Sequence, residues 1–580
     1  MSEIEEAKVA RAVSLEDGSD KVVPKDLEDY VDAQTTDETD TSSISYVNQI
    51  KSRFPHYKLA IHIFWGCFFT AWWISIIAQD KHRPKWLIPT IFWGMMMVRL
   101  ITFHSRILYI LLGYVKYVWD YFCDIIYTKL FPSRPIRLLV GGIITLAVIL
   151  VGTFVPSETE YSKRADRAVS FFGVVVTIAG LYITSNNRSK IQWRTVIAGL
   201  LMQFIIALFV LRTKCGYDVF NFISTLAREL LGFAKDGVAF LTNAEVSAYG
   251  MFFFAVLPAV AFFVAFIHIL YYFGIMQWCI RKFAYFFFWA LKVTGAEAVT
   301  AAGSPFLGIG ESSVLVKDFM PFLTKAEIHQ VMCSGFSTIS GSVLVGYIGL
   351  GLNPQAMVSS CVMSIPASLA ISKLRYPETE IAVTSSRCEV TDNIENEENK
   401  PVNVLQAFAN GAGLGLRIAG FMMIQCMCII ALVALINGVL TWFGKFWNIH
   451  HLTLELMLSY ILYPVSFLLG TPRSEILLVS KLIATKIIQN EYNAYSIMLN
   501  DAPYNEMSKR ATIIATYALC GFSNLGSMGI QIGVLGTLAP KKVKDIASVI
   551  VSSLISGLLA TLLSTAIAAM VMHDLGGFVV

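Results

Sequence analysis

Two carboxylates lie in apolar stretches that small residues interrupt. Glu311 sits in AAGSPFLGIGESSVLVKDF (301–319), and Glu491 sits in IATKIIQNEYNAYS (483–496). A charged side chain inside a membrane is costly, so it faces the interior of a helix bundle, pairs with a basic group or lines a solute path. We interpret Glu311 as a group that helps to hold a polar solute, and a proton, halfway across a bilayer. Lys486 is the expected ion-pair partner of Glu491.

A similar segment follows each carboxylate. VMCSGFSTISGSVLVGY (331–347) comes after Glu311, YALCGFSNLGSMGIQIGV (517–534) comes after Glu491, and both contain Gly-Phe-Ser. Gly and Ser free backbone groups of a membrane helix, which is tolerated only where protein or a cavity satisfies them. Half-helix ends at matching positions of two repeats are typical of a transporter site, although close helix packing also uses small residues. The sequence predicts two re-entrant hairpins, each followed by a broken helix.

The composition indicates that lipid surrounds most of the chain. Of 580 residues, 55% are hydrophobic and only 15% are charged, whereas soluble domains carry about 25% charged residues. A membrane helix needs about 20 mostly apolar residues. We therefore expect an all-α polytopic membrane protein with about eleven membrane helices, at 57–78, 84–103, 136–155, 168–185, 194–212, 248–272, 328–350, 355–373, 415–440, 508–536 and 545–572.

Several functional classes are disfavoured by the sequence. The net charge of +4 comes without a basic run, which argues against nucleic acid as a partner. The ten cysteines are scattered, so we expect neither a metal site nor a disulfide framework. We expect no cofactor and no catalytic residues, because a membrane hydrolase that used Glu311 or Glu491 as its base would need a metal motif or a nucleophile.

The polar stretches suggest a division of the chain. We predict an interfacial amphipathic helix at 216–237, and a linker helix at 107–127 for which a twelfth membrane span is the alternative. The basic segments favour a cytoplasmic N-terminus, and eleven crossings then place the C-terminus outside. The expected parts are a disordered acidic cytoplasmic tail (1–45), extra membrane helices and a linker (46–135), scaffold helices (136–275), a first transport repeat (276–375), a polar cytoplasmic loop (376–402) and a second half (403–580).

These motifs resemble a known family. GESSVLVKDFMPFLTKAEIHQVMCSGFSTISGSVLVGY, ATKIIQNEYNAY and IIATYALCGFSNLGSMGIQIG are similar to the concentrative nucleoside transporters, and the similarity runs from about residue 136 to 572. The chain looks like a eukaryotic, fungal-like member. The resemblance implies a homotrimer whose subunits each carry nucleosides of the adenosine and uridine class by an elevator-like motion. One departure is Tyr492-Asn493, where the family has Phe-Val after Asn-Glu.

The resemblance also assigns substrate-binding residues. It implies that the nucleobase side is formed by Ile309, Gly310, Glu311 and Tyr347. It implies that the ribose side is formed by Glu491, Phe522, Asn524 and Ser527. Carboxylate and amide groups suit a vicinal diol, because the carboxylate accepts both hydroxyl hydrogens and the amide can donate and accept.

The coupling ion is where the sequence departs most from sodium-coupled relatives. In these relatives the resemblance places a sodium site at the positions of Ser304, Leu307, Ser342 and Val343, with Asn in place of Ser304. Because the loss of an amide oxygen weakens a site for a hard cation, we expect a proton, carried by Glu311. Sodium coupling and passive, uncoupled transport stay open as alternatives.

The resulting expectation is a multi-pass transporter in the plasma membrane that imports nucleosides by cation symport. One further polar residue has a local interpretation. His329, beside Glu327 at the start of a helix, is expected to cap that helix or to lie at the surface.

Overall fold

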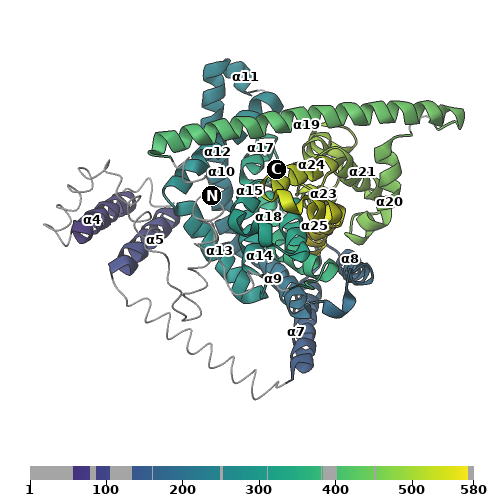
Figure 1. Ribbon diagram of the computed structural model, residues 1–580, viewed down its shortest axis with the longest axis horizontal. Coiled ribbons are helices and arrows are strands. Elements are labelled where there is room, and N and C mark those ends of the chain that lie inside the picture. The colour runs from purple at the N-terminus through teal and green to yellow at the C-terminus, as the bar shows by residue number, and fades with distance from the viewer. Residues whose placement is uncertain are drawn as a thin grey trace, which may run out of the picture. The chain divides into compact units, whose positions relative to one another are not determined.

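The computed structural model describes two separate parts of the chain, in which every regular element is helical. The described residues are 57–78, 86–104, 133–159, 161–248, 252–309, 311–380, 382, 401–449 and 452–572. The expected tail at 1–45, the linker helix at 107–127 and most of the loop at 376–402 lie outside them. The smaller part is a helix pair, α4 (Tyr57–Ala78) and α5 (Leu87–His104), and Figure 1 draws it in purple.

The larger part begins with seven helices before the first predicted hairpin. Thr213 caps α10 by accepting from the backbone of Gly216, and α10 contains the amphipathic segment expected at 216–237. The helices are α7 (Arg134–Phe154), α8 (Arg164–Ile183), α9 (Trp193–Arg212), α10 (Lys214–Leu241), α11 (Ala244–Ala248), α12 (Phe252–Tyr272) and α13 (Ile275–Leu291).

The two predicted transport units follow in turn, and each has two short helices before a broken one. The first consists of α14 (Gly295–Gly303), α15 (Glu311–Val314), α16 (Lys325–Ser337) and α17 (Gly341–Gly349), and α18 (Pro354–Arg375) comes after it. The second consists of α21 (Ile476–Ile488), α22 (Glu491–Asn500), α23 (Lys509–Leu519) and α24 (Leu525–Leu538), and α25 (Val543–Val571) comes after it.

A very long helix and a shorter one connect the two units. Helix α19 (Val404–Phe446) is drawn in Figure 1 as one green rod, and it packs along α12. Its 43 residues correspond to about 65 Å, which exceeds the roughly 30 Å hydrocarbon thickness of a bilayer. Helix α20 (Leu454–Leu468) returns from its end and packs against α21.

Each of the eleven expected windows contains helix. Among the described residues, six helices are long and apolar enough to cross a membrane, and α12 with α13 adds a seventh candidate, bent by 83°. The windows at 328–350 and 508–536 are broken helices, which confirms the interruption that Gly, Ser and Asn predicted. The fold is therefore the all-α polytopic membrane class expected from the sequence.

The helix breaks are structured by matching caps. Ser340 begins α17 and its hydroxyl accepts from the backbone N–H of Val343, at 3.3 Å. Asn524 begins α24, and its side-chain oxygen accepts from the N–H of Ser527, at 2.8 Å. Such caps replace the hydrogen bonds that a new helix lacks at its first turn. The two repeats thus restart their broken helices in the same way.

Candidate functional site

Glu491 is the first residue of α22, at the tip of the second hairpin. Asn490 caps the helix, because its side-chain oxygen accepts from the N–H of Asn493 at 2.7 Å. A carboxylate in the first turn also interacts favourably with the helix dipole. Glu491 is only 5% exposed, so its charge requires partners within the protein.

Both carboxylate oxygens of Glu491 have a side-chain donor. The Tyr347 hydroxyl donates to Oε1 at 2.7 Å, and the Asn524 amide donates to Oε2 at 2.8 Å. Because Asn524 also caps α24 toward Ser527, one amide fixes a helix end and the carboxylate together. The structure thus brings together three of the four residues assigned to the ribose side, and Tyr347 from the nucleobase set joins them.

Lys486 does not pair with Glu491 as the sequence suggested. Its ammonium group donates to the backbone carbonyl of Ala518, at 3.0 Å, and the side chain is fully buried. The reason is that α21 ends at Ile488, so the chain turns between the two residues and they do not share one helical face. Lys486 instead satisfies a carbonyl at the end of α23.

Tyr347, which donates to the Glu491 carboxylate, lies beside two other aromatic rings. The Tyr347 ring lies 5.3 Å from the ring of Tyr495 and 6.2 Å from that of Tyr492, measured between centroids. Phe522, the remaining ribose-side residue, is half-buried and packs against both apolar cores of the larger part. Phe522 lies in the helix break, two residues before Asn524.

The two helix breaks contact each other. Phe522 donates its N–H to the carbonyl of Thr338 at 3.3 Å, and the Ser523 hydroxyl donates to the carbonyl of Phe336 at 2.8 Å. Gly521 has a φ of +146°, and a Cβ there would lie 3.0 Å from the same Phe336 carbonyl. Backbone groups released in one break are thus satisfied by the other, as a membrane interior requires.

The tip of the first hairpin meets α24 through a residue that the sequence reasoning missed. Gln531 is fully buried and donates to the carbonyl of Ile309 at 2.9 Å. It follows Ser527 by about one helical turn, so both lie on the same face of α24. The only available signal was an amide within the apolar run GIQIGV. Gly310 and the side chain of Glu311 lie outside the described residues.

The four positions at which the resemblance places a sodium site in sodium-coupled relatives lie at two facing segments. Ser304 ends α14 and donates its hydroxyl to the carbonyl of Thr300, at 2.7 Å. A Cβ at Gly341 would lie 3.2 Å from the carbonyl of Phe306, so the loop that holds Ser304 and Leu307 contacts the start of α17, where Ser342 and Val343 follow.

The groups at these positions that could bind a cation are hydroxyl and carbonyl oxygens. The side chain of Ser342 lies outside the described residues. Oxygen ligands of this kind suit a hard cation. The part of the chain that the structure describes holds no group of three or more His, Cys, Asp or Glu side chains that could bind a metal ion.

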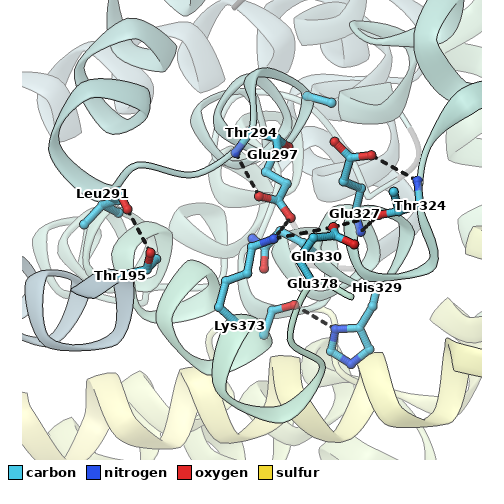
Figure 2. A network of polar contacts seen from close by, with 12 residues as sticks. Thr195, Leu291, Thr294, Glu297, Thr324, Glu327, His329, Gln330, Lys373 and Glu378 are labelled. Carbon is cyan, nitrogen blue, oxygen red and sulfur yellow. Dashed lines mark hydrogen bonds and ion pairs between the residues drawn. The ribbon is translucent and has the colours of Figure 1, made fainter. Parts of the chain in front are cut away.

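A buried polar network that the sequence analysis did not predict holds the base of the first hairpin (Figure 2). Glu297 accepts from the N–H of Thr294 at 3.0 Å, within a capping box that starts α14. Its other oxygen lies 2.5 Å from the ammonium group of Lys373 on α18. Both side chains are at most 1% exposed. The ion pair therefore joins the hairpin to a central helix.

The same network reaches the start of α16. Thr324 and Glu327 form a second capping box, and the Thr324 hydroxyl donates to Glu378 at 2.8 Å. Figure 2 shows Glu378 beside Lys373, and the two charged groups are 4.0 Å apart. Two carboxylates, Glu297 and Glu378, thus lie within 4.0 Å of one buried lysine.

His329 is buried, so its expected surface or capping position is wrong. It is 0% exposed, its Nδ1 lies 2.7 Å from the hydroxyl of Ser372, and its ring stacks on Tyr376 at 5.1 Å. Helix α16 starts at Lys325 and is enclosed by α18 and α25, so a residue in its second turn is already interior. Periodicity alone does not reveal these neighbours.

Three family models match the larger part of the chain. The model described as the C-terminus of Na+ dependent nucleoside transporters matches residues 356–569. The corresponding N-terminal model matches 172–245, and a model described as nucleoside recognition matches 253–353.

Individual relatives cover the same region. The chain is 37% identical over 427 residues to solute carrier family 28 member 3 of Eptatretus stoutii, and 32% identical over 436 residues to sodium/nucleoside cotransporter 1 of Oryctolagus cuniculus. These matches cover 71% and 73% of this chain, but only 61% and 65% of the relatives.

Solved structures have a similar fold over most of this chain. The structure of CNTnw in an inward-facing, substrate-bound state has a TM-score of 0.66 and 32% identity, and the match covers 70% of this chain and 98% of CNTnw. A variant of CNTnw in an outward-facing state has a TM-score of 0.67, with coverage of 71% and 99%.

Proposed function

Because this chain belongs to the concentrative nucleoside transporter family, we propose that it carries nucleosides across a membrane together with a cation. The observation that carries the proposal is the buried Glu491 carboxylate, which Tyr347 and Asn524 hold at the tip of the second hairpin. The fold is that of a multi-pass membrane transporter and not of an enzyme.

The ribose is the group that this arrangement suits. The Glu491 carboxylate accepts hydrogen bonds from the 2′ and 3′ hydroxyls, and Asn524 and Ser527 complete the polar side of the site. Charge-assisted hydrogen bonds are stronger than neutral ones, and the two donors orient the carboxylate before substrate arrives. Phe522 packs against the sugar. A nucleoside without these hydroxyls does not donate to the buried carboxylate, which loses the ribose hydrogen bonds, and it therefore binds weakly.

The nucleobase binds at the tip of the first hairpin. Ile309, Gly310 and Glu311 form this side, and the Gln531 bond to the Ile309 carbonyl holds the tip over the face of α24 that carries Ser527. The two hairpin tips therefore enclose one nucleoside next to the two helix breaks, which contact each other.

A proton on Glu311 is our proposal for the coupled cation. Ser304 supports it, because a hydroxyl that donates back to Thr300 stands where sodium-coupled members have an amide oxygen. Sodium is the second candidate. Two observations favour it: the Phe306 carbonyl lies beside Gly341, and several relatives are named sodium/nucleoside cotransporters.

The transport cycle is proposed to alternate between outward-facing and inward-facing states. The matched structures of CNTnw include outward-facing, intermediate and inward-facing states. By analogy, the hairpins and broken helices of each subunit move as an elevator within a homotrimer, surrounded by lipid. The plasma membrane, with the N-terminus in the cytoplasm and the C-terminus outside, is the proposed location.

The experiment is uptake of labelled uridine and adenosine into proteoliposomes. An inward proton gradient or an inward sodium gradient is imposed, with the other ion balanced. Accumulation above equilibrium under the proton gradient alone is the expected result. Accumulation under sodium alone would overturn proton coupling, and equilibration under both gradients would indicate passive transport. Absence of uptake of either nucleoside would contradict the proposed function.

A further inference from the structure

A second carboxylate, Glu455, connects the tip of the hairpin that carries Glu491 to the long helix α19. One oxygen of Glu455 accepts from the side-chain amide of Gln489, at 2.7 Å. The other accepts from the side-chain amide of Asn437, at 2.8 Å. Asn437 lies on α19 and Gln489 ends α21, so one carboxylate bridges two elements that do not adjoin in the sequence.

The hairpin side of this bridge continues to the start of α22. The Gln489 side chain donates to Glu455 and accepts from the side-chain amide of Asn493. Asn493 also donates its backbone N–H to the capping oxygen of Asn490. These residues surround the turn from which Glu491 projects. A tie at Gln489 therefore restricts the turn and, through it, the position of the Glu491 carboxylate.

The α19 side is anchored equally well. While the Asn437 amide donates to Glu455, its oxygen accepts from the N–H of Leu454 at 2.8 Å. Both ends of the amide are thus used, which fixes its orientation. Asn437 lies within the segment of α19 that is apolar enough to span a membrane, where a polar side chain is expected to have partners.

Helix stability alone does not account for Glu455. An acidic residue in the first turn favours the helix dipole, but α20 already has a cap, because the Thr453 hydroxyl accepts from the N–H of Leu456 at 3.1 Å. An interaction with the dipole of α20 also does not require the side-chain amides of Asn437 and Gln489 to donate to Glu455. The two short hydrogen bonds to Glu455 point to a connection between elements.

We propose that Glu455 is a positioning residue that ties the tip of the second hairpin to α19 and thereby sets the nucleoside affinity of the Glu491 site. The chain of contacts runs from Asn437 through Glu455 and Gln489 to Asn493. This role rests on the proposed function. Asn493 is one of the two residues at which the sequence departs from the family pattern that it resembles, and a Val at this position could not donate to Gln489.

The test exchanges the acid and the amide. In Glu455→Gln, one carboxylate oxygen is replaced by an NH₂ group. This NH₂ group then faces the NH₂ group of Gln489 or of Asn437, and because both can only donate, one hydrogen bond of the bridge is lost. In the double variant Glu455→Gln with Gln489→Glu, the carbonyl at 455 accepts from Asn437. Its NH₂ donates to the carboxylate at 489, which still accepts from Asn493. All three hydrogen bonds are thereby restored.

Two measurements are made on the purified full-length protein. Amide hydrogen exchange at residues 487–493 is recorded without nucleoside, and the Kd for uridine is measured separately. We expect Glu455→Gln to increase exchange at the tip and the Kd by about tenfold, because a hydrogen bond to a charged group is lost. The exchanged double variant is expected to return both close to the wild-type values. Asn493→Val should raise both less.

Asn500→Ala is the matched control, because Asn500 ends α22, the helix that begins at Glu491, and its amide donates to the carbonyl and hydroxyl of Ser496 one turn earlier. Tip exchange in Glu455→Gln equal to that of this control would overturn the proposal. Failure of the double variant to restore either measurement would also overturn it. If the wild-type protein bound no uridine, the proposed function would fall, while the exchange data would still decide whether the tie exists.

Discussion

At Glu491, the two donors to one buried carboxylate come from different halves of the repeat. Tyr347 belongs to α17, after the first helix break, and Asn524 begins α24, after the second. The carboxylate itself belongs to the second hairpin. The position of the Glu491 carboxylate therefore depends on how the two helix breaks pack against each other. A substitution of either donor thus tests the assembled site and not one local element.

Tyr347→Phe tests the first donor. It removes the 2.7 Å hydrogen bond to Glu491 and keeps the ring between Tyr492 and Tyr495. We expect the Kd for uridine to rise about tenfold, because hydrogen bonds to charged groups are the stronger class. Isothermal titration of the purified protein measures this change. The half-exposed Tyr463→Phe is the control, and an equal Kd for both variants would argue against the role of Tyr347.

Gln531→Met tests the tip of the first hairpin. The substitution keeps the side-chain volume but leaves the Ile309 carbonyl without its 2.9 Å donor. We expect uridine to bind several-fold more weakly, since a buried acceptor becomes unsatisfied. The affinity ratio of uridine to 2′-deoxyuridine should stay unchanged, because the ribose contacts are elsewhere. Competition binding with both nucleosides checks this, and a changed ratio would place Gln531 on the ribose side.

At the scale of elements, the breaks were predictable but their partners were not. Gly and Ser in both repeats, together with Asn524 in the second, indicated where α16 and α23 end. The contact of Ser523 with Phe336 joins residues far apart in the sequence, and no local pattern encodes it. For the same reason Lys486 was paired with Glu491 from spacing alone, whereas its carbonyl partner lies on another helix. The local sequence predicts where a helix is interrupted, whereas tertiary packing determines which groups form hydrogen bonds with the backbone that the interruption frees.

Lys373→Met tests the ion pair that joins the first hairpin to α18. It leaves the fully buried Glu297 carboxylate without its cation, so we expect the free energy of unfolding to fall by roughly 3–5 kcal/mol. Thermal unfolding in detergent measures the loss.

Two further variants define the cause of that loss. Adding Glu297→Gln to Lys373→Met removes the unpaired charge but keeps a carbonyl for Thr294, and it should recover much of the stability. Lys325→Met removes the exposed partner of Asp545 and should change little. Similar destabilisation by Lys373→Met and Lys325→Met would contradict the importance of the buried pair.

At the scale of the whole molecule, composition was sufficient for the class of protein and the motifs for the family. The 15% charged residues and the apolar windows predicted an all-α membrane protein, and six described helices meet the length and hydropathy for a span. The polar network around Lys373 and the tie through Glu455 were not predicted. In each, single polar residues from separate helices meet only after the bundle has assembled.

The most direct test of the account is competition for labelled uridine on the purified full-length protein. We predict that uridine competes fully, whereas 2′,3′-dideoxyuridine competes at least about 100-fold more weakly, because it lacks the two ribose hydroxyls that donate to the buried Glu491 carboxylate. Glu491→Gln should abolish high-affinity binding, while Glu506→Gln, at an exposed position, should not. Equal competition by the two nucleosides would contradict the assignment of Glu491 to the ribose.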